Sequence, residues 1–109
     1  MANISAKRLK EKLDDQKVCV LDVRSAEKFA LNHITHHNTD MINIPKQRIF
    51  DIADNDEPID IPFSKETEIV ITCTTGNSAG KCADILEDKG YQVTVLEGGI
   101  TAWNNADES

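Results

Sequence analysis

Cys73 follows a short run of β-branched residues and is itself followed by small, turn-tolerant residues. The run at 69–71 reads Ile-Val-Ile, which predicts a strand covered on both faces. Beyond the turn, Ser78 is expected to cap a helix, because apolar residues then recur at helical spacing. Those residues are Ala79, Cys82, Ala83 and Leu86. Cys73 is therefore expected at the carboxyl end of a strand, facing a helix N-terminus, where open α/β sheets bind ligands.

The expected surroundings of Cys73 favour an anion. Backbone amides of the following loop can point inward as a cradle, and the helix N-terminus adds a partial positive charge. Such a position stabilises the thiolate, which is the nucleophilic form of cysteine. The alternative is a small core residue, because unpaired cysteine is among the most buried residue types; the position of Cys73 favours the reactive interpretation. The candidate anion-binding loop comprises Thr74, Thr75, Gly76, Asn77, Ser78 and Ala79.

The remaining sequence predicts strands that alternate with helices, which is typical of a parallel α/β sheet with right-handed crossovers. Strands are predicted at 18–23, 41–44 and 91–96, in addition to the one before Cys73. Helices are predicted at 6–13 and 26–31, capped by Ser5 and Ser25, and at 45–52, with Pro45 at the first helical position. Gly90 is expected to end the helix that follows Cys73.

Two further segments complete the expected organisation. The acidic stretch 54–62, which carries two prolines, is predicted to be a mobile loop. After a sharp turn at Gly98 and Gly99, a closing helix is expected to pack Trp103 on the core, and residues 104–109 to form a frayed tail. The whole chain, 1–109, is expected to be one domain with a single core.

Asp22 and Arg24 flank the carboxyl end of the strand predicted at 18–23. If that strand is parallel to the one before Cys73, both side chains lie at the same edge of the sheet as the cysteine. The other two cysteines fall elsewhere. Cys19 lies within a strand and is expected to pack in the core, and Cys82 lies on the apolar face of a helix.

The composition limits the partners and the compartment. The net charge of −7 disfavours binding to nucleic acid or to an anionic membrane without a local basic patch. Three cysteines is an odd number without paired metal spacing, which fits a reducing cytoplasm better than a disulfide scaffold. No apolar run approaches the ~18 residues of a membrane span, and the N-terminus lacks a signal pattern.

The segment 32–40 contains all three histidines, His33, His36 and His37. Imidazole is a common metal ligand, so a metal site is one interpretation. The spacing matches no known cluster, and no cysteine or acidic partner falls in register nearby. A solvated loop is therefore the preferred interpretation, and neither a metal nor a cofactor is expected.

Three blocks of this sequence resemble the single-domain rhodanese family of sulfurtransferases. Residues 21–24 (Leu-Asp-Val-Arg), with Glu27, Phe29 and His33-Ile34, are similar to the family's "DVR…EF…GHI" block, and 42–45 (Ile-Asn-Ile-Pro) to its "INIP". Residues 73–77 resemble the active-site loop, and 96–103 the closing "EGG…W" block. The order and spacing of these blocks cover nearly the whole chain.

The resemblance implies a five-stranded parallel sheet flanked by helices, in which Cys73 accepts a sulfane sulfur as a persulfide. The donor would be thiosulfate or a persulfide, and the acceptor a small thiol, cyanide or a protein. The loop amides from Thr74 to Ala79 would hold the persulfide anion. Asp22 and Arg24 would brace the loop region through hydrogen bonds, with direct substrate contact as the alternative for Arg24.

One departure bears on function. The family loop commonly carries an arginine five residues after the cysteine, and Ser78 stands there in this chain. The missing guanidinium would supply charge and a forked donor for an anionic sulfonate. Three functions therefore stay open: a sulfurtransferase or persulfide carrier, a non-catalytic rhodanese-like binding module, and a phosphatase of the related cysteine-dependent kind. The phosphatase is the weakest of these, because phosphoryl transfer from a cysteine requires that arginine and a longer loop.

Overall fold

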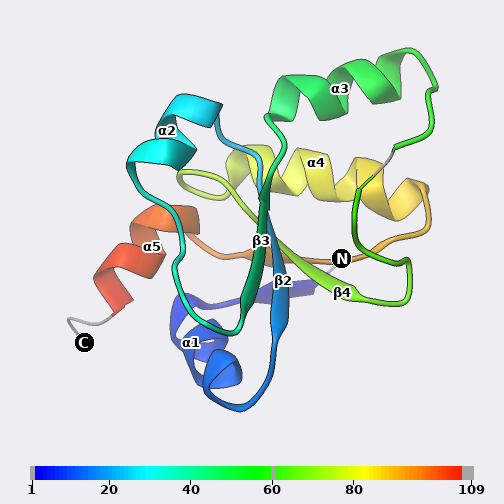
Figure 1. The fold of residues 1–109 in the computed structure, drawn as a ribbon. Coiled ribbons are helices and arrows are strands. Elements are labelled where there is room, and N and C mark those ends of the chain that lie inside the picture. Colours follow the sequence, from blue (N-terminus) through cyan, green and yellow to red (C-terminus); the bar gives the residue numbers. More distant parts are fainter. Residues whose placement is uncertain (1, 60, 107–109) are drawn as a thin grey trace.

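The computed structural model describes residues 2–59 and 61–106. Within them the chain forms a sheet whose strands lie in the order β1-β5-β4-β2-β3 (Figure 1). Each neighbouring pair is parallel, which confirms the predicted five-stranded parallel α/β sheet. The strands are β1 (Ala2–Ile4), β2 (Val18–Asp22), β3 (Thr39–Asn43), β4 (Glu68–Thr72) and β5 (Gln92–Leu96).

Helices cover both faces of the sheet (Figure 1). On one face α1 (Ala6–Asp15) and α5 (Gly99–Asn105) enclose a core that includes Leu9, Leu13 and Ile100. On the other, α3 (Lys46–Asp54) and α4 (Asn77–Asp88) enclose a second core that includes Ile49 and Leu86. No helix in the described ranges is both long and apolar enough to cross a bilayer.

The shortest strand, β1, was not predicted from the residue pattern, although the family resemblance implied a fifth strand. It has only three residues, two of them exposed, so no alternation of apolar and polar residues marks it. It forms the sheet edge by pairing with β5, with Ile4 opposite Leu96. Its extended conformation therefore depends on a partner that lies about ninety residues away in the sequence.

Several predicted helix ends are confirmed. The Ser5 side chain accepts a hydrogen bond from the backbone N–H of Arg8 (3.1 Å), and that of Ser25 accepts from the N–H of Lys28 (3.3 Å). Gly90 ends α4 in the left-handed region with φ 93°. These hydroxyls and this glycine satisfy backbone groups that a helix leaves without partners at its ends.

The predicted start of α4 is wrong. The helix begins at Asn77, with Gly76 as its N-cap in the left-handed conformation (φ 107°), and Ser78 lies inside the first turn. Ser78 therefore does not cap the helix. At the other predicted start, Pro45 is the N-cap of α3 rather than its first helical residue.

The tail predicted to fray, residues 104–109, begins inside α5, and its fraying stays a prediction. Asn104 and Asn105 continue α5, and Ala106 packs against the core on that face of the sheet. This contact holds the last turn in place. Residues 107–109, which belong to the same prediction, lie outside the described residues.

The acidic stretch 54–62 contacts the core at two apolar side chains. Ile61 is buried in the core between the sheet and α3 and α4, and Ile59 packs against it. Asp54 is the last residue of α3, and Asp60 lies outside the described residues. The mobility of this stretch stays a prediction.

The direction in which the chain crosses the sheet reverses between β2 and β4. From β2 the chain moves outward to β3, whereas from β4 it moves the other way to β5, so the chain leaves the carboxyl ends of these two paired strands in opposite directions. Such a point leaves a crevice outside the strand ends. Asp22 ends β2 opposite Thr72, and Cys73 follows directly.

We predict that Leu21→Ala lowers the free energy of unfolding by about 2–5 kcal/mol, because the side chain is fully buried in a packed core. Leu31→Ala is the matched control, since Leu31 is 86% exposed, and should change it by less than about 0.5 kcal/mol. Urea denaturation of both variants measures the difference. Equal losses would contradict the assignment of Leu21 to the core.

Candidate active site

The sulfur of Cys73 takes the place of a side-chain cap at the N-terminus of α4. Its Sγ accepts hydrogen bonds from the backbone N–H of Gly76 (2.9 Å) and of Ala79 (3.4 Å), and the residue is 5% exposed. Ala79 is the third residue of α4, the position whose N–H a capping side chain usually binds. These amides and the helix terminus together favour negative charge on the sulfur.

The opposite side of the loop is held by the N-terminus of α5. The backbone N–H of Ile100 donates to the carbonyl of Cys73 (2.9 Å), and that of Thr101 donates to the carbonyl of Thr74 (3.1 Å). Gly99 approaches so closely that a Cβ there would lie 2.3 Å from the Cys73 carbonyl oxygen. The carbonyls of Cys73 and Thr74 are therefore bound by amides of α5, while the amides of Gly76 and Ala79 donate to the sulfur.

Arg24 and Asp22 form a buried ion pair next to this loop. The Asp22 side chain is fully buried, and the guanidinium donates to both carboxylate oxygens, with Nη2 to Oδ2 at 2.7 Å. The guanidinium also donates to the carbonyl of Asn32, which ends α2 (Ala26–Leu31). A bidentate pair of this kind has a defined orientation as well as charge.

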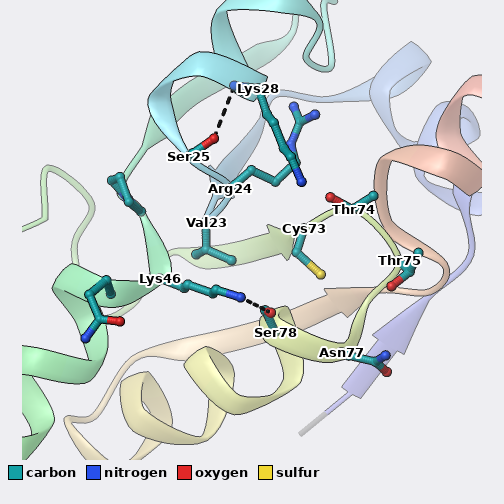
Figure 2. A pocket seen from close by; sticks show the side chains of 12 residues that line it. Val23, Arg24, Ser25, Lys28, Lys46, Cys73, Thr74, Thr75, Asn77 and Ser78 are labelled. Atoms are coloured by element: carbon teal, nitrogen blue, oxygen red, sulfur yellow. Dashed lines mark hydrogen bonds between the residues drawn. The ribbon is translucent and has the colours of Figure 1, made fainter.

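A pocket of about 490 Å³ opens above Cys73 (Figure 2). It lies at the crevice between the ends of β2 and β4, and its lining includes the cationic residues Arg24, Lys28 and Lys46 but, within the described part of the chain, no aspartate or glutamate. The lining residues are Val23, Arg24, Ser25, Lys28, Pro45, Lys46, Gln47, Cys73, Thr74, Thr75, Asn77 and Ser78. The pocket is thus locally positive in a chain whose net charge is −7.

The structure brings the predicted site residues together. Thr74, Thr75 and Asn77 are exposed along the pocket wall, whereas Ala79 is buried beneath it. The expected hydrogen bonds from Arg24 to the Cys73 loop are not observed: in the described residues its side-chain partners are Asp22 and Asn32. The pair holds the end of α2, a helix that buries none of its own residues.

Sequence reasoning missed Lys46, the first residue of α3. Its ammonium donates to the hydroxyl of Ser78 (3.3 Å), so it reaches across the pocket from α3 to α4 (Figure 2). The sequence did contain a signal for Lys46. The segment 42–45 includes the end of a predicted parallel strand, and the residue that follows Pro45 is therefore expected near the same sheet edge as Cys73. Lys28 on α2 was missed in the same way.

The other two cysteines differ from Cys73. Cys82 is fully buried, as predicted, and its pKa is raised from 9.0 to about 12 by burial and then by Cys73, while the ammonium of Lys46 lowers it. Cys19 is half-buried and belongs to neither core, so its expected core packing is wrong; burial and then Asp40 raise its pKa. Side chains alternate along a strand, so Cys19 lies on the same face of β2 as Leu21, but only Leu21 belongs to the buried core on that face.

The histidines serve local structure. His33 stacks on Phe29 and its Nδ1 lies 2.8 Å from the Phe29 carbonyl oxygen. His36 stacks on His37, and its Nδ1 accepts from the backbone N–H of Asn38. Among the described residues, no group of three or more His, Cys, Asp or Glu side chains is arranged to hold a metal ion.

This arrangement can perform nucleophilic chemistry on an anion. A cysteine sulfur with two N–H donors lies at the base of a pocket whose charged side chains are cationic. The geometry therefore combines a nucleophile, donors for a developing negative charge and an entrance that attracts anions.

The fold and the sequence both match known proteins. The family model for the Rhodanese-like domain matches residues 5–106. The curated Bacillus subtilis (strain 168) protein "Putative sulfurtransferase YtwF" is 31% identical over 101 residues, which cover 92% of this chain and 87% of that protein.

Solved structures agree with these sequence matches. The rhodanese-like domain protein from Staphylococcus aureus superposes with a TM-score of 0.76 at 31% identity, covering 94% of this chain and 91% of that one. SSP1007 from Staphylococcus saprophyticus gives a TM-score of 0.75 at 26% identity, covering 94% and 93%. The chain therefore belongs to the rhodanese-like family, as the sequence blocks indicated.

We predict that Gly99→Ala destabilises the protein by about 1–3 kcal/mol, because its Cβ would overlap the Cys73 carbonyl and φ is 59°. Displacement of the loop should also slow alkylation of Cys73 by iodoacetamide about threefold or more, since the amides that favour the thiolate move. Gly80→Ala is the control: nothing lies within 4 Å of its Cβ, and it should leave both quantities unchanged or raise stability slightly. Equal changes in stability and in alkylation rate for the two variants would contradict the prediction that Gly99 holds the Cys73 loop in place.

We predict that limiting iodoacetamide at neutral pH labels Cys73 before Cys19 and Cys82. The raised pKa of Cys82 (about 12) keeps that thiol neutral as pH rises through 9, so labelling at pH 9 should increase at Cys19 and remain absent at Cys82 in the folded protein. The same shift implies that Cys82 lowers stability as pH rises from about 9 towards 12, because only the unfolded thiol ionises there. Peptide mapping identifies the labelled site, and first labelling at Cys19 would contradict the prediction.

Proposed function

We propose that this protein is a sulfurtransferase or persulfide carrier that moves sulfane sulfur through a persulfide on Cys73. The observation that carries the proposal is the sulfur itself, which accepts two backbone N–H groups at the end of β4 and faces a pocket with cationic side chains. Membership of the rhodanese-like family and the sulfurtransferase name of the Bacillus subtilis relative support the same function.

The reaction proceeds in two displacements at sulfur. With thiosulfate, the Cys73 thiolate attacks the outer sulfur, a new S–S bond forms to Cys73, and sulfite leaves with the electron pair of the broken bond. A thiolate acceptor then attacks the terminal sulfur of the persulfide, and Cys73 leaves as a thiolate. A small persulfide donor works in the same way and releases a thiolate instead of sulfite.

The loop residues Thr74 to Ala79 form the wall around the persulfide in this proposal. The amides of Gly76 and Ala79 hold the Cys73 thiolate before attack and after release, when the charge lies on Sγ. Asp22 and Arg24 support the site indirectly, because their ion pair fixes the end of α2, whose Lys28 lines the pocket. Direct contact between Arg24 and the substrate remains the alternative role.

The partners of this reaction are a small anionic or persulfide donor and a thiol or protein acceptor. We propose that residues 1–109 carry the reaction as one domain without a cofactor, since each step needs only Cys73 and the two substrates. The three cysteines without disulfide partners fit a reducing compartment, which makes the cytoplasm our proposed location.

A non-catalytic binding module is the second candidate, because Ser78 stands where the family loop commonly has arginine. Under that hypothesis the pocket would hold an anion without forming a covalent bond. The phosphatase hypothesis is weaker, since the loop between β4 and α4 has no arginine to bind a phosphoryl group. Only the sulfurtransferase hypothesis predicts covalent sulfur on Cys73.

We predict that incubation with thiosulfate, or with a small persulfide, increases the intact mass by one sulfur atom, and that cyanide then removes it as thiocyanate. Cys73→Ser should abolish the increase, whereas Cys82→Ser should retain it. Mass spectrometry of the intact protein and of its peptides measures both. If neither donor loads wild-type protein, the binding-module hypothesis holds; sulfur retained in Cys73→Ser would assign the reaction to another residue.

A further inference from the structure

The cation nearest the expected arginine position comes from a different helix. Lys46 begins α3, and its ammonium donates to the hydroxyl of Ser78 on α4 (3.3 Å), the residue that stands five positions after Cys73. Ser78 is half-buried and lines the pocket together with Lys46 (Figure 2). The site has therefore lost a guanidinium from its own loop, yet retains a positive charge beside that position.

The backbone places this lysine by contacts that do not depend on its side chain. The backbone N–H of Lys46 donates to the carbonyl of Val23 (2.8 Å), which is itself next to Arg24 at the end of β2. Pro45 directly precedes it as the N-cap of α3, with φ −56°. The Lys46 Cα is thus tied to the same sheet edge as Cys73, and its long side chain extends over the pocket.

The chemistry of the pair suits an anionic ligand. One N–H of the ammonium goes to Ser78, which leaves its other N–H groups available to a ligand oxygen or sulfur. Among the described residues no carboxylate lines the pocket to neutralise this charge, and the buried Asp22 carboxylate is already paired with Arg24. Lys46 therefore stands as a cation of the pocket that has a hydroxyl, not an acid, as its side-chain partner.

We propose that Lys46 is the specificity-determining residue of the pocket, binding the anionic group of the sulfur donor in place of the arginine that Ser78 replaces. The substrate class is thus a donor that carries negative charge beyond the transferred sulfur, such as a thiosulfonate. The sulfur-transfer part rests on the proposed function, whereas the attraction of anions to Cys73 does not and can be measured separately.

The first experiment compares the alkylation of Cys73 by iodoacetate, an anion, with that by iodoacetamide, its neutral analogue. We expect Lys46→Gln to lower the ratio of the two rate constants about fivefold at low salt, mainly through iodoacetate. Lys46→Arg should keep the ratio near the wild-type value. Lys7→Gln is the matched control, because it makes the same change in net charge on the exposed surface of α1. The wild-type ratio should also fall as salt is added, and that of Lys46→Gln should fall less.

A second experiment tests whether a cation at position 78 can replace the cation at position 46. Ser78→Arg in the Lys46→Gln background should restore the ratio, because a guanidinium then occupies the family position. An unchanged ratio in Lys46→Gln, or an equal fall in Lys7→Gln, would overturn the proposal. A fall in Lys28→Gln without one in Lys46→Gln would also overturn it and assign the role to α2.

The kinetics of sulfur transfer then distinguish the role of Lys46 from the proposed function. With thiosulfate and cyanide, Lys46→Gln should raise KM about fivefold with kcat within about twofold, as expected when a charge binds ground state and transition state alike. With a neutral persulfide donor, the variant should match the wild type. If neither protein transfers sulfur, the proposed function fails, and the alkylation ratio alone still decides whether Lys46 draws anions to Cys73.

Discussion

The loop that carries Cys73 keeps its shape because the backbone of Gly99 packs directly against it. This close contact is possible because glycine has no side chain. A Cβ at Gly99 would lie 2.3 Å from the Cys73 carbonyl oxygen, so only glycine allows α5 to begin where its first amides can bind the loop carbonyls. Ile100 and Thr101 provide those amides. With the carbonyls bound by α5, the amides of Gly76 and Ala79 are left to meet the sulfur.

The contact between Gly99 and the Cys73 loop joins, at the site, helices from the two faces of the sheet. β4 and α4 supply the cysteine and the helix terminus, whereas the support comes from the last helix, which packs on the opposite face of the sheet. On the other side of the pocket, the Asp22 and Arg24 pair holds the end of α2. Cys73 therefore lies between two supports, neither of which supplies the N–H groups bound by its sulfur.

Charge is distributed unevenly in this chain. The net charge of −7 belongs to the chain as a whole, while the pocket is lined by Arg24, Lys28 and Lys46 and by no carboxylate of the residues that the structure describes. Exposed charges are screened within about 10 Å at moderate salt, so the acidic surface elsewhere opposes an approaching anion only weakly. The local arrangement, and not the net charge, therefore determines how readily an anion approaches Cys73. Burial also keeps Cys82 protonated, with a pKa of about 12, so it does not compete as a nucleophile.

The sequence by itself determined the parallel α/β class, four of the strands, the place of Cys73 after β4 and the presence of Asp22 and Arg24 at the same edge. Those features follow from local patterns. β-branched runs, helical spacing and glycine turns each involve only a few neighbouring residues, so each can be recognised within a single segment. The family resemblance supplied the fifth strand and the expected role of the cysteine.

Only the tertiary structure decided the rest, because it depends on residues that are distant in the sequence. β1 is a strand through its pairing with β5. Ser78 could have capped α4 on local grounds, but Gly76 turns the chain one residue before Asn77, so Ser78 lies inside the first turn and the Cys73 sulfur accepts the N–H that a cap at Gly76 would bind. Arg24 could have reached the loop, but in the folded chain its guanidinium donates to Asp22 and to the carbonyl of Asn32. Lys46 joins the site because parallel strands end at one edge, which brings the starts of α3 and α4 together across the pocket.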